Sequence, residues 1–277
     1  MNASSAALFA LTLLALAAPA AAQVPDRPTG APTGSQFVAQ VRSLPAPARE
    51  AAILREVTAG NVPDFERAFQ RVAFTATDAA LRPRRVEVWV LPDYLAIGTD
   101  RDFVRMPMTP LTAQRICDAL GCSLPTRKIV NEVWKAAAVK LTPQPLPPTA
   151  AMTTPDYFLK AEKKIEAQWG ARPLGPLTAG DKKDVVISNR LVAHPDRVAI
   201  YGWHWPSGQP IQPLSTVHAN TYADYSHGVR PVWGYVRIDG RVLALADALK
   251  DAALAPCLSD EGVMPSPRVP GVPPPRP

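Results

Sequence analysis

The order of apolar and polar positions along the chain shows two periods, and each predicts a different kind of element. Apolar residues at helical spacing predict two helices near the N-terminus, around 37–41 and 51–57, and Gly60-Asn61 ends the second. The period then changes to two residues, which predicts short strands over 71–77, 86–90, 94–98 and 103–106. We therefore expect a small helical part followed by an antiparallel meander.

The remainder of the chain repeats this order of helices and then strands. Thr109-Pro110 predicts the start of a helix that Gly121 ends, a second helix covers 129–134, and Thr154-Pro155 starts a third that ends at Gly170. Strand patterns return over 184–188, 197–204, 225–232 and 234–238. Asp239-Gly240 predicts a hairpin turn into 241–243, and a short helix follows over 244–254.

Helices and strands that come in blocks, rather than in strict alternation, predict an α+β fold. We expect a mainly antiparallel sheet in the C-terminal half, with helices packed on it and a helical and meander part before it. The pattern indicates one domain over 37–262. It consists of an N-terminal part (37–150) and a part that carries the functional site (151–262).

The two ends of the chain have different compositions. The short apolar run over 6–18, with small residues before Gln23, predicts an export signal over 1–22 that is cleaved near Ala22. Residues 23–36 are predicted to be a flexible leader and 263–277 a disordered, Pro-rich tail. A secreted or periplasmic protein is expected. The apolar run is too short for a good membrane span, and no later stretch is predicted to span a membrane.

Composition and charge narrow the class of partner. Hydrophobic residues make up 47% and charged residues 19% of the 277 positions, which is typical of a globular protein. A net charge of +6 favours an acidic extracellular polymer, such as cell-wall material or an anionic polysaccharide or peptide. Nucleic acid is disfavoured, because the chain has no dense run of Lys or Arg. The odd number of cysteines, three in all, permits one disulfide whose pairing stays open: Cys117, Cys122 and Cys257.

The stretch from His218 to Arg230 concentrates the groups that can do chemistry. It holds two of the four histidines together with an aspartate, two tyrosines, a serine and an arginine, and His204 lies shortly before it. Titratable groups that gather in this way are typical of active sites. The predicted catalytic residues are Lys183, His204, His218, Tyr222, Asp224, His227 and Arg230.

One hypothesis is a metal site. Imidazole and carboxylate groups suit a divalent cation, zinc first, and His204, His218 and Asp224 form the predicted ligand set. On a regular strand, Asp224 and His227 would point to opposite faces. Both can reach one site only if a loop or bulge lies at Tyr225-Ser226.

A second hypothesis is metal-free acid–base chemistry. Histidine exchanges protons near neutral pH, tyrosine can assist, and Lys183 and Arg230 can stabilise developing negative charge. A phosphodiesterase or a polysaccharide lyase would use such a set, and a glycosidase would pair Asp184 with Asp224. A third hypothesis is a nucleophilic Ser226 beside His227, although neighbouring strand residues point apart.

The same residues also fit interpretations without catalysis. Each one taken singly suits a structural role, with Lys182-Lys183 in an exposed turn and Asp224 capping a turn. An exported binding module would grip an acidic polymer through Trp203, Trp205 and Trp233 together with basic residues. Because the titratable groups cluster, we expect an exported hydrolase of an extracellular polymer, with a lyase or a binding module as the alternative.

Overall fold

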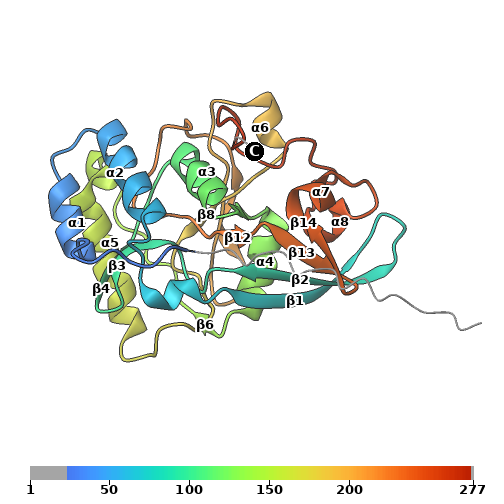
Figure 1. Ribbon diagram of the computed structural model, residues 1–277, viewed down its shortest axis with the longest axis horizontal. Coiled ribbons are helices and arrows are strands. Elements are labelled where there is room, and N and C mark those ends of the chain that lie inside the picture. The colour runs from blue at the N-terminus through green and yellow to red at the C-terminus, as the bar shows by residue number, and fades with distance from the viewer. Residues whose placement is uncertain (1–23, 276–277) are drawn as a thin grey trace, which may run out of the picture.

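The chain folds into helices and short strands in the block order that the sequence indicates. The structure is a computed structural model that describes residues 24–275 (Figure 1). The helices are α1 (Gly34–Val41), α2 (Ala46–Thr58), α3 (Pro110–Ala119), α4 (Arg127–Ala136), α5 (Pro155–Trp169), α6 (Arg190–Ala193), α7 (Leu245–Lys250) and α8 (Ala255–Leu258), with 3-10 turns at Asp64–Arg67 and Ala150–Thr153. The predicted export signal lies outside the described residues.

Most strands belong to two sheets. The first sheet contains β1 (Gln70–Thr77), β2 (Pro83–Val90), β5 (Cys122–Ser123), β12 (Val232–Trp233), β13 (Tyr235–Ile238) and β14 (Arg241–Ala244). The second sheet contains β8 (Lys183–Val185), β9 (Ile200–His204), β10 (Pro210–Ser215) and β11 (His227–Gly228). Two small ladders pair β3 (Ala96–Thr99) with β4 (Asp102–Arg105) and β6 (Val139–Lys140) with β7 (Thr178–Ala179).

The pairing is mainly antiparallel, so the predicted α+β class is confirmed. Only β8–β11 and β6–β7 pair in parallel among the described strands. Strand β2 is the centre of the first sheet: β1 pairs along one edge, and β13 and β12 share the other. The hairpin from the N-terminal part and the C-terminal strands thus form one sheet, which Figure 1 shows at the right of the molecule.

Local sequence explains where several elements begin and end. The Thr109 and Thr126 side chains accept hydrogen bonds from backbone N–H groups of Thr112 and Ile129, so each caps the helix that follows it. Asp239 and Gly240 both have positive φ, 49° and 83°, as the two-residue turn of the β13–β14 hairpin requires. Within residues 24–275 no helix combines the length and apolarity that crossing a membrane demands.

The predicted strand over 225–232 forms only in part. Residues 227–228 and 232–233 pair in ladders, while the Asp224–His227 segment is a turn in which the His227 N–H donates to the Asp224 carbonyl at 3.0 Å. The Asp224 carboxylate also accepts the Ser226 N–H at 2.8 Å. Because the Asp224 side chain gives the backbone a hydrogen-bond partner other than a neighbouring strand, residues 225–226 form a turn and the strand begins only at His227.

The C-terminal segment also differs from the sequence-based expectation. Its composition predicts disorder over 263–277, but the described part packs back on the domain. Met264 and Val269 are each 1% exposed, and Arg268 forms an ion pair with Asp118 of α3 at 2.9 Å. The Val269 N–H donates to Gln114 at 2.9 Å. The prolines therefore set a rigid path across the surface rather than a free tail.

Truncation tests this packing. Removing residues 264–277 exposes the apolar surface that Met264 and Val269 cover. We expect the free energy of unfolding to fall by about 3–6 kcal/mol. Denaturant unfolding measures the change. Truncation after Pro273 is the matched control, because Met264, Arg268 and Val269 all remain; an equal loss in both truncations would contradict the role of the segment.

Candidate functional site

The turn from Tyr222 to His227 arranges most of the predicted site residues around one carboxylate. The Asp224 oxygens accept hydrogen bonds from the Ser226 hydroxyl at 2.5 Å, the Ser226 N–H at 2.8 Å and the Tyr222 hydroxyl at 3.0 Å. A turn of this kind is the condition for Asp224 and His227 to share a site, and the structure contains it. We call Lys183, His218, Tyr222, Asp224, Ser226 and His227 the turn cluster.

The surroundings of Asp224 keep it ionised. Burial by itself would raise the pKa of this carboxyl, but interaction with His227, the two hydrogen bonds from Ser226 and the charge of Lys183 outweigh burial and lower it. The pKa of the Tyr222 hydroxyl is raised by burial and then by the negative charge of Asp224, so Tyr222 stays protonated. Asp224 therefore supplies a fixed negative charge that orients both hydroxyl groups.

His227 is the most unusual member of the turn cluster. Its side chain is fully buried, and neither ring nitrogen has a hydrogen-bond partner among the described residues. Burial lowers the pKa of His227 to about 4, despite the opposing charge of Asp224, so the ring is neutral at neutral pH. A neutral imidazole has one donor and one acceptor nitrogen, and leaving both unused in the interior costs free energy.

The outer members of the turn cluster lie nearer the surface. His218 and Tyr222 are half-buried and their rings stack with centroids 4.3 Å apart, and the Tyr222 ring meets His227 edge-on at 5.7 Å. Tyr222 also lines a cavity of about 380 Å³, whose charged side chains are Arg49 and Glu50 of α2. A ligand in this cavity would contact Tyr222, whose ring also touches His218 and His227.

The second sheet separates His204 from this cluster. Parallel pairing places Lys183 and His227 on one face, and Asp184 and its partner Tyr201 lie on the other. The His204 ring meets Tyr201 edge-on and lies tilted against Trp134 of α4, and its Nε2 lies 3.0 Å from the Asn131 Oδ1. The structure therefore does not bring His204 together with His218 and Asp224.

The ligand set predicted for zinc is thus not assembled. No group of three or more His, Cys, Asp or Glu side chains within residues 24–275 is arranged to hold a metal ion. Both Asp224 oxygens already accept hydrogen bonds. The described side chains do not fit a zinc site built on His204, His218 and Asp224.

The geometry supports neither a serine nucleophile nor a pair of catalytic carboxylates. The Ser226 hydroxyl donates to Asp224, and His227 has no hydrogen-bond partner among the described residues, so no Ser–His pair forms there. Asp184 accepts a hydrogen bond from the Tyr94 hydroxyl at 2.7 Å, and β8 alternation turns it away from the Lys183 face. Asp184 and Asp224 therefore do not face each other as the paired carboxylates of a glycosidase would.

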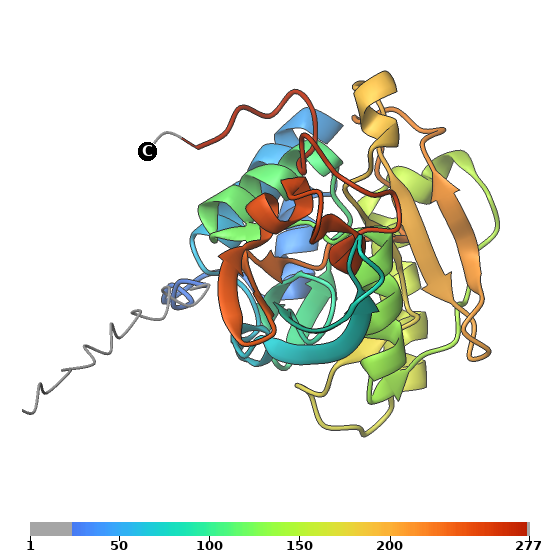
Figure 2. The same ribbon diagram turned by 90° about the vertical axis from the view of Figure 1, so that its right-hand side faces the viewer.

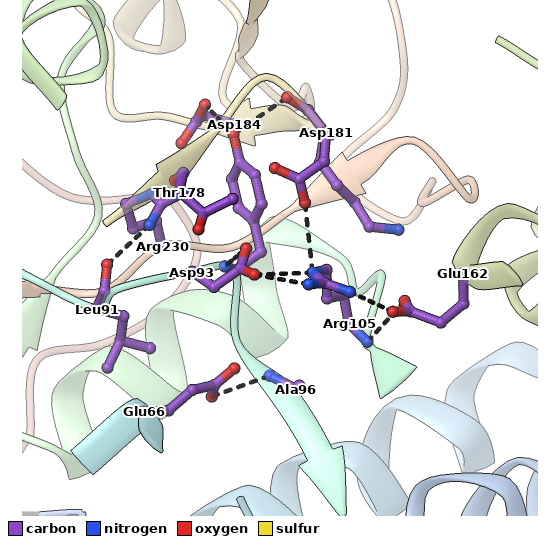
Figure 3. Close-up of polar contacts among 12 residues, drawn as sticks. Glu66, Leu91, Asp93, Ala96, Arg105, Glu162, Thr178, Asp181, Asp184 and Arg230 are labelled. Carbon is purple, nitrogen blue, oxygen red and sulfur yellow. Dashed lines mark hydrogen bonds and ion pairs between the residues drawn. The ribbon is translucent and has the colours of Figure 1, made fainter. Parts of the chain in front are cut away.

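Arg230 lies in the core rather than in the site. Its guanidinium donates to the carbonyls of Leu91 and Thr178, each at 2.7 Å (Figure 3). It also stacks over the Tyr94 ring at 4.4 Å. Only 1% of its surface is accessible, which leaves nothing to meet a substrate. Gly228 of β11 packs so tightly on Tyr94 that a Cβ would lie 2.4 Å from the ring. By stacking on the same ring, Arg230 supports β11.

A buried ion network, defined here as Asp93, Arg105, Glu162 and Asp181, lies beneath the second sheet (Figure 3). Arg105 is 2% exposed and pairs with Asp93 at 2.7 Å, with Glu162 of α5, and with Asp181 at 3.4 Å. Burial and the nearby Asp93 raise the pKa of Asp181 to about 7, against the opposing effect of Arg105. No sequence pattern indicates this network, since its members are far apart along the chain.

The network is tied to the turn cluster through the residues before β8. The Lys182 ammonium, which is fully buried, donates to the Tyr225 carbonyl at 2.7 Å. Asp181 lines a small cavity of about 10 Å³ together with Ser226, enough for roughly one water molecule. The expectation of an exposed turn at Lys182-Lys183 is wrong for Lys182. The signal in the sequence is a run of four charges that leads directly into the apolar Val185-Val186-Ile187.

The cysteines take no part in this chemistry. All three thiols are unpaired, and burial raises the pKa of Cys122 to about 12, which leaves it protonated and unreactive.

Comparisons of the chain with protein-family models, with curated proteins and with solved structures give no match. The geometry of the site itself therefore has to indicate the function.

Replacing Arg105 by Met tests the buried ion network. The substitution keeps the side-chain volume but leaves Asp93 and Glu162 buried without their cation, and we expect a loss of about 3–5 kcal/mol in unfolding free energy. Denaturant unfolding with Arg42→Met is the control, because the Arg42–Asp156 pair is largely exposed and is expected to contribute under about 1 kcal/mol. Similar losses in the two variants would contradict this role of Arg105.

Proposed function

We propose that this protein is an exported hydrolase that cleaves an extracellular acidic polymer by metal-free acid–base chemistry at the turn cluster. The observation that carries the proposal is His227, which is buried with both ring nitrogens unused beside an ionised Asp224. A buried polar group without a partner needs an explanation, and a role in a functional site is the one proposed here. The net charge of +6 and the predicted export signal support an acidic polymer outside the cell.

In this proposal the half-buried His218 removes a proton from the attacking water and returns a proton to the leaving group. The elements of water are added across the cleaved bond, so no other reactant is needed. Asp224 holds the Tyr222 ring through the 3.0 Å hydrogen bond, and Tyr222 in turn stacks on His218. The position of His218, the proposed base, therefore depends on the Asp224 carboxylate.

Lys183 supplies the positive charge that stabilises developing negative charge. It is half-buried, and its Nζ lies 5.4 Å from the centre of the Trp203 ring. Burial lowers its pKa, although the charge of Asp224 opposes the shift. A cation in a partly desolvated site stabilises a nearby anion more strongly than one in water. His227 provides the buried donor and acceptor that complete the polar surface under Tyr222.

Histidine substitutions separate this proposal from the zinc hypothesis. His218→Ala is expected to lower polymer hydrolysis by about a hundredfold or more, because it removes the proton-transferring group. His227→Gln is expected to lower hydrolysis as well, because it removes the buried imidazole that the Tyr222 ring contacts. Release of soluble fragments from labelled cell-wall sacculi and from polygalacturonate is the measurement. His194→Ala, in an exposed loop, is the matched control and should keep full activity.

His204→Gln gives the discriminating result. The acid–base proposal expects it to alter stability and to retain most of the activity, whereas a His204-containing zinc site would lose both activity and bound metal. Elemental mass spectrometry of each purified variant measures the metal. Full activity in His218→Ala would refute the assignment of the base. Parallel loss of zinc and turnover in His204→Gln would refute the metal-free mechanism.

The pKa of His227 also predicts how stability varies with pH. Its folded-state pKa of about 4 lies below the ordinary histidine value of about 6.5, so the unfolded chain binds this proton more readily. Its contribution is present above pH 6.5 and disappears as pH falls towards 4. We expect His227→Gln to flatten the curve of unfolding free energy over this window, by up to roughly 3 kcal/mol. Parallel curves for the two proteins would contradict the buried neutral state.

A further inference from the structure

The outer face of the first sheet carries a second group of basic and aromatic side chains. Alternation along β2 points Val86, Val88 and Val90 into the core and the residues between them outward. Neighbouring strands add side chains to the same face. The outer-face cluster comprises Arg71 of β1, Arg85, Glu87 and Trp89 of β2, Trp233 of β12, and Tyr235 and Arg237 of β13. Figure 2 shows the β1–β2 hairpin curving along the lower side of the molecule.

Glu87 organises three arginines on this face. Its Oε1 accepts hydrogen bonds from Arg71 at 2.8 Å and from Arg85 at 3.0 Å, and its Oε2 accepts one from Arg237 at 3.0 Å. The Glu87 side chain is 6% exposed, while those of the arginines are 51%, 70% and 43% exposed. Three guanidinium groups against one carboxylate leave a net charge of +2.

These arginines keep donors free for another anion. A guanidinium has five N–H groups, and each arginine donates one of them to the shared carboxylate. Arg85, Glu87 and Arg237 line a surface depression of about 210 Å³ that Gly240 completes. Planar, fixed guanidinium groups bind carboxylate or phosphate oxygens in bidentate geometry. The depression is therefore suited to an anionic group.

Aromatic rings continue the cluster along the sheet. The Arg237 guanidinium stacks over Trp89 at 5.2 Å, Trp89 meets Trp233 edge-on at 5.5 Å, and Trp233 lies 5.1 Å from Tyr235. All three rings are half-buried. Their contacts fix their orientation, so a ligand would order few side chains on binding. Large amphipathic rings of this kind pack against apolar faces of a ligand while their edges stay in water.

We propose that the outer-face cluster binds an acidic polysaccharide, with sugar rings on Trp89, Trp233 and Tyr235 and the acid group on Arg85 and Arg237. A sugar polymer with carboxylate groups combines the ring faces and the negative charge that the two halves of the cluster match. The site lies on the first sheet and the turn cluster on the second. Binding at the outer-face cluster goes beyond the proposed hydrolysis, because this cluster would hold the polymer without cleaving it.

Binding is measured by calorimetry with polygalacturonate, using the full chain with His218→Ala so that turnover cannot consume the polymer. Arg85→Ala/Arg237→Ala is expected to raise Kd by about tenfold or more, because each arginine loses a charge-assisted hydrogen bond to the ligand. Arg101→Ala/Arg115→Ala, with the same change in net charge on exposed side chains elsewhere, should bind like the parent. Unfolding curves establish that both variants are folded.

A second variant tests the aromatic half. Trp233→Leu should weaken binding of polygalacturonate and leave binding of inorganic polyphosphate, which has no sugar ring, unchanged. Neutral dextran should bind at least about tenfold more weakly than polygalacturonate. The proposal is overturned if the two double-arginine variants lose affinity equally, if dextran binds as tightly as polygalacturonate, or if double-stranded DNA binds more tightly than either. Unaltered hydrolysis with lost binding would leave the turn cluster assignment intact.

Discussion

The burial of the Arg105 guanidinium is the constraint on which the arrangement of this protein depends. A guanidinium does not lose its proton in a protein, so in the interior it needs hydrogen-bond acceptors, and Arg105 meets this need with carboxylates. Asp93 precedes β3, Glu162 comes from α5, and Asp181 precedes β8. One side chain thus fixes three segments that lie far apart in the sequence. Any shift of α5 or of the chain before β8 would leave a buried charge unpaired.

The buried charges also have to balance. Five carboxyl groups in this region (Glu66, Asp93, Glu162, Asp181 and Asp184) are buried with Arg105, Lys182 and Arg230 as the cations. Five negative charges against three positive ones would leave an excess of two. Burial raises the pKa of Glu66 well above its ordinary value and that of Asp181 to about 7, so protonation of these carboxyl groups offsets part of this excess.

This support reaches the turn cluster through a few contacts. Lys182 donates to the Tyr225 carbonyl, and the Tyr94 hydroxyl donates to Asp184 and approaches the Lys182 carbonyl at 3.1 Å. The strand β8 is therefore held from below, and its pairing with β11 places His227 beside Lys183. Rigid support of this kind lets a short turn hold Asp224 and His227 in fixed positions, even though much of the backbone that carries the turn cluster is irregular.

Strand alternation also explains why two surfaces of different chemistry coexist. On the second sheet it separates Lys183 and His227 from Asp184 and Tyr201, while the positive φ of Gly202 and Trp203 breaks the alternation of β9 and leaves His204 beside Tyr201 on the face that packs on α4. On the first sheet it directs Glu87 and Trp89 outward. The proposed catalytic and binding surfaces thus arise from the same rule, applied to two sheets that share no strand.

The sequence by itself determined the elements whose signals are local. The cap at Thr109, the end of α5 at Gly170 and the turn at Asp239-Gly240 depend on residues close together in the chain, so periodicity and turn chemistry predicted them. The density of polar residues likewise drew attention to the stretch around Asp224. Only the tertiary structure decided which histidines meet. His204 and His227 are separated by a sheet whose irregular β9, with positive φ at Gly202 and Trp203, no period could reveal. The network around Arg105 also came from the fold alone, because pairing charges across long sequence separations depends on packing and leaves no local pattern.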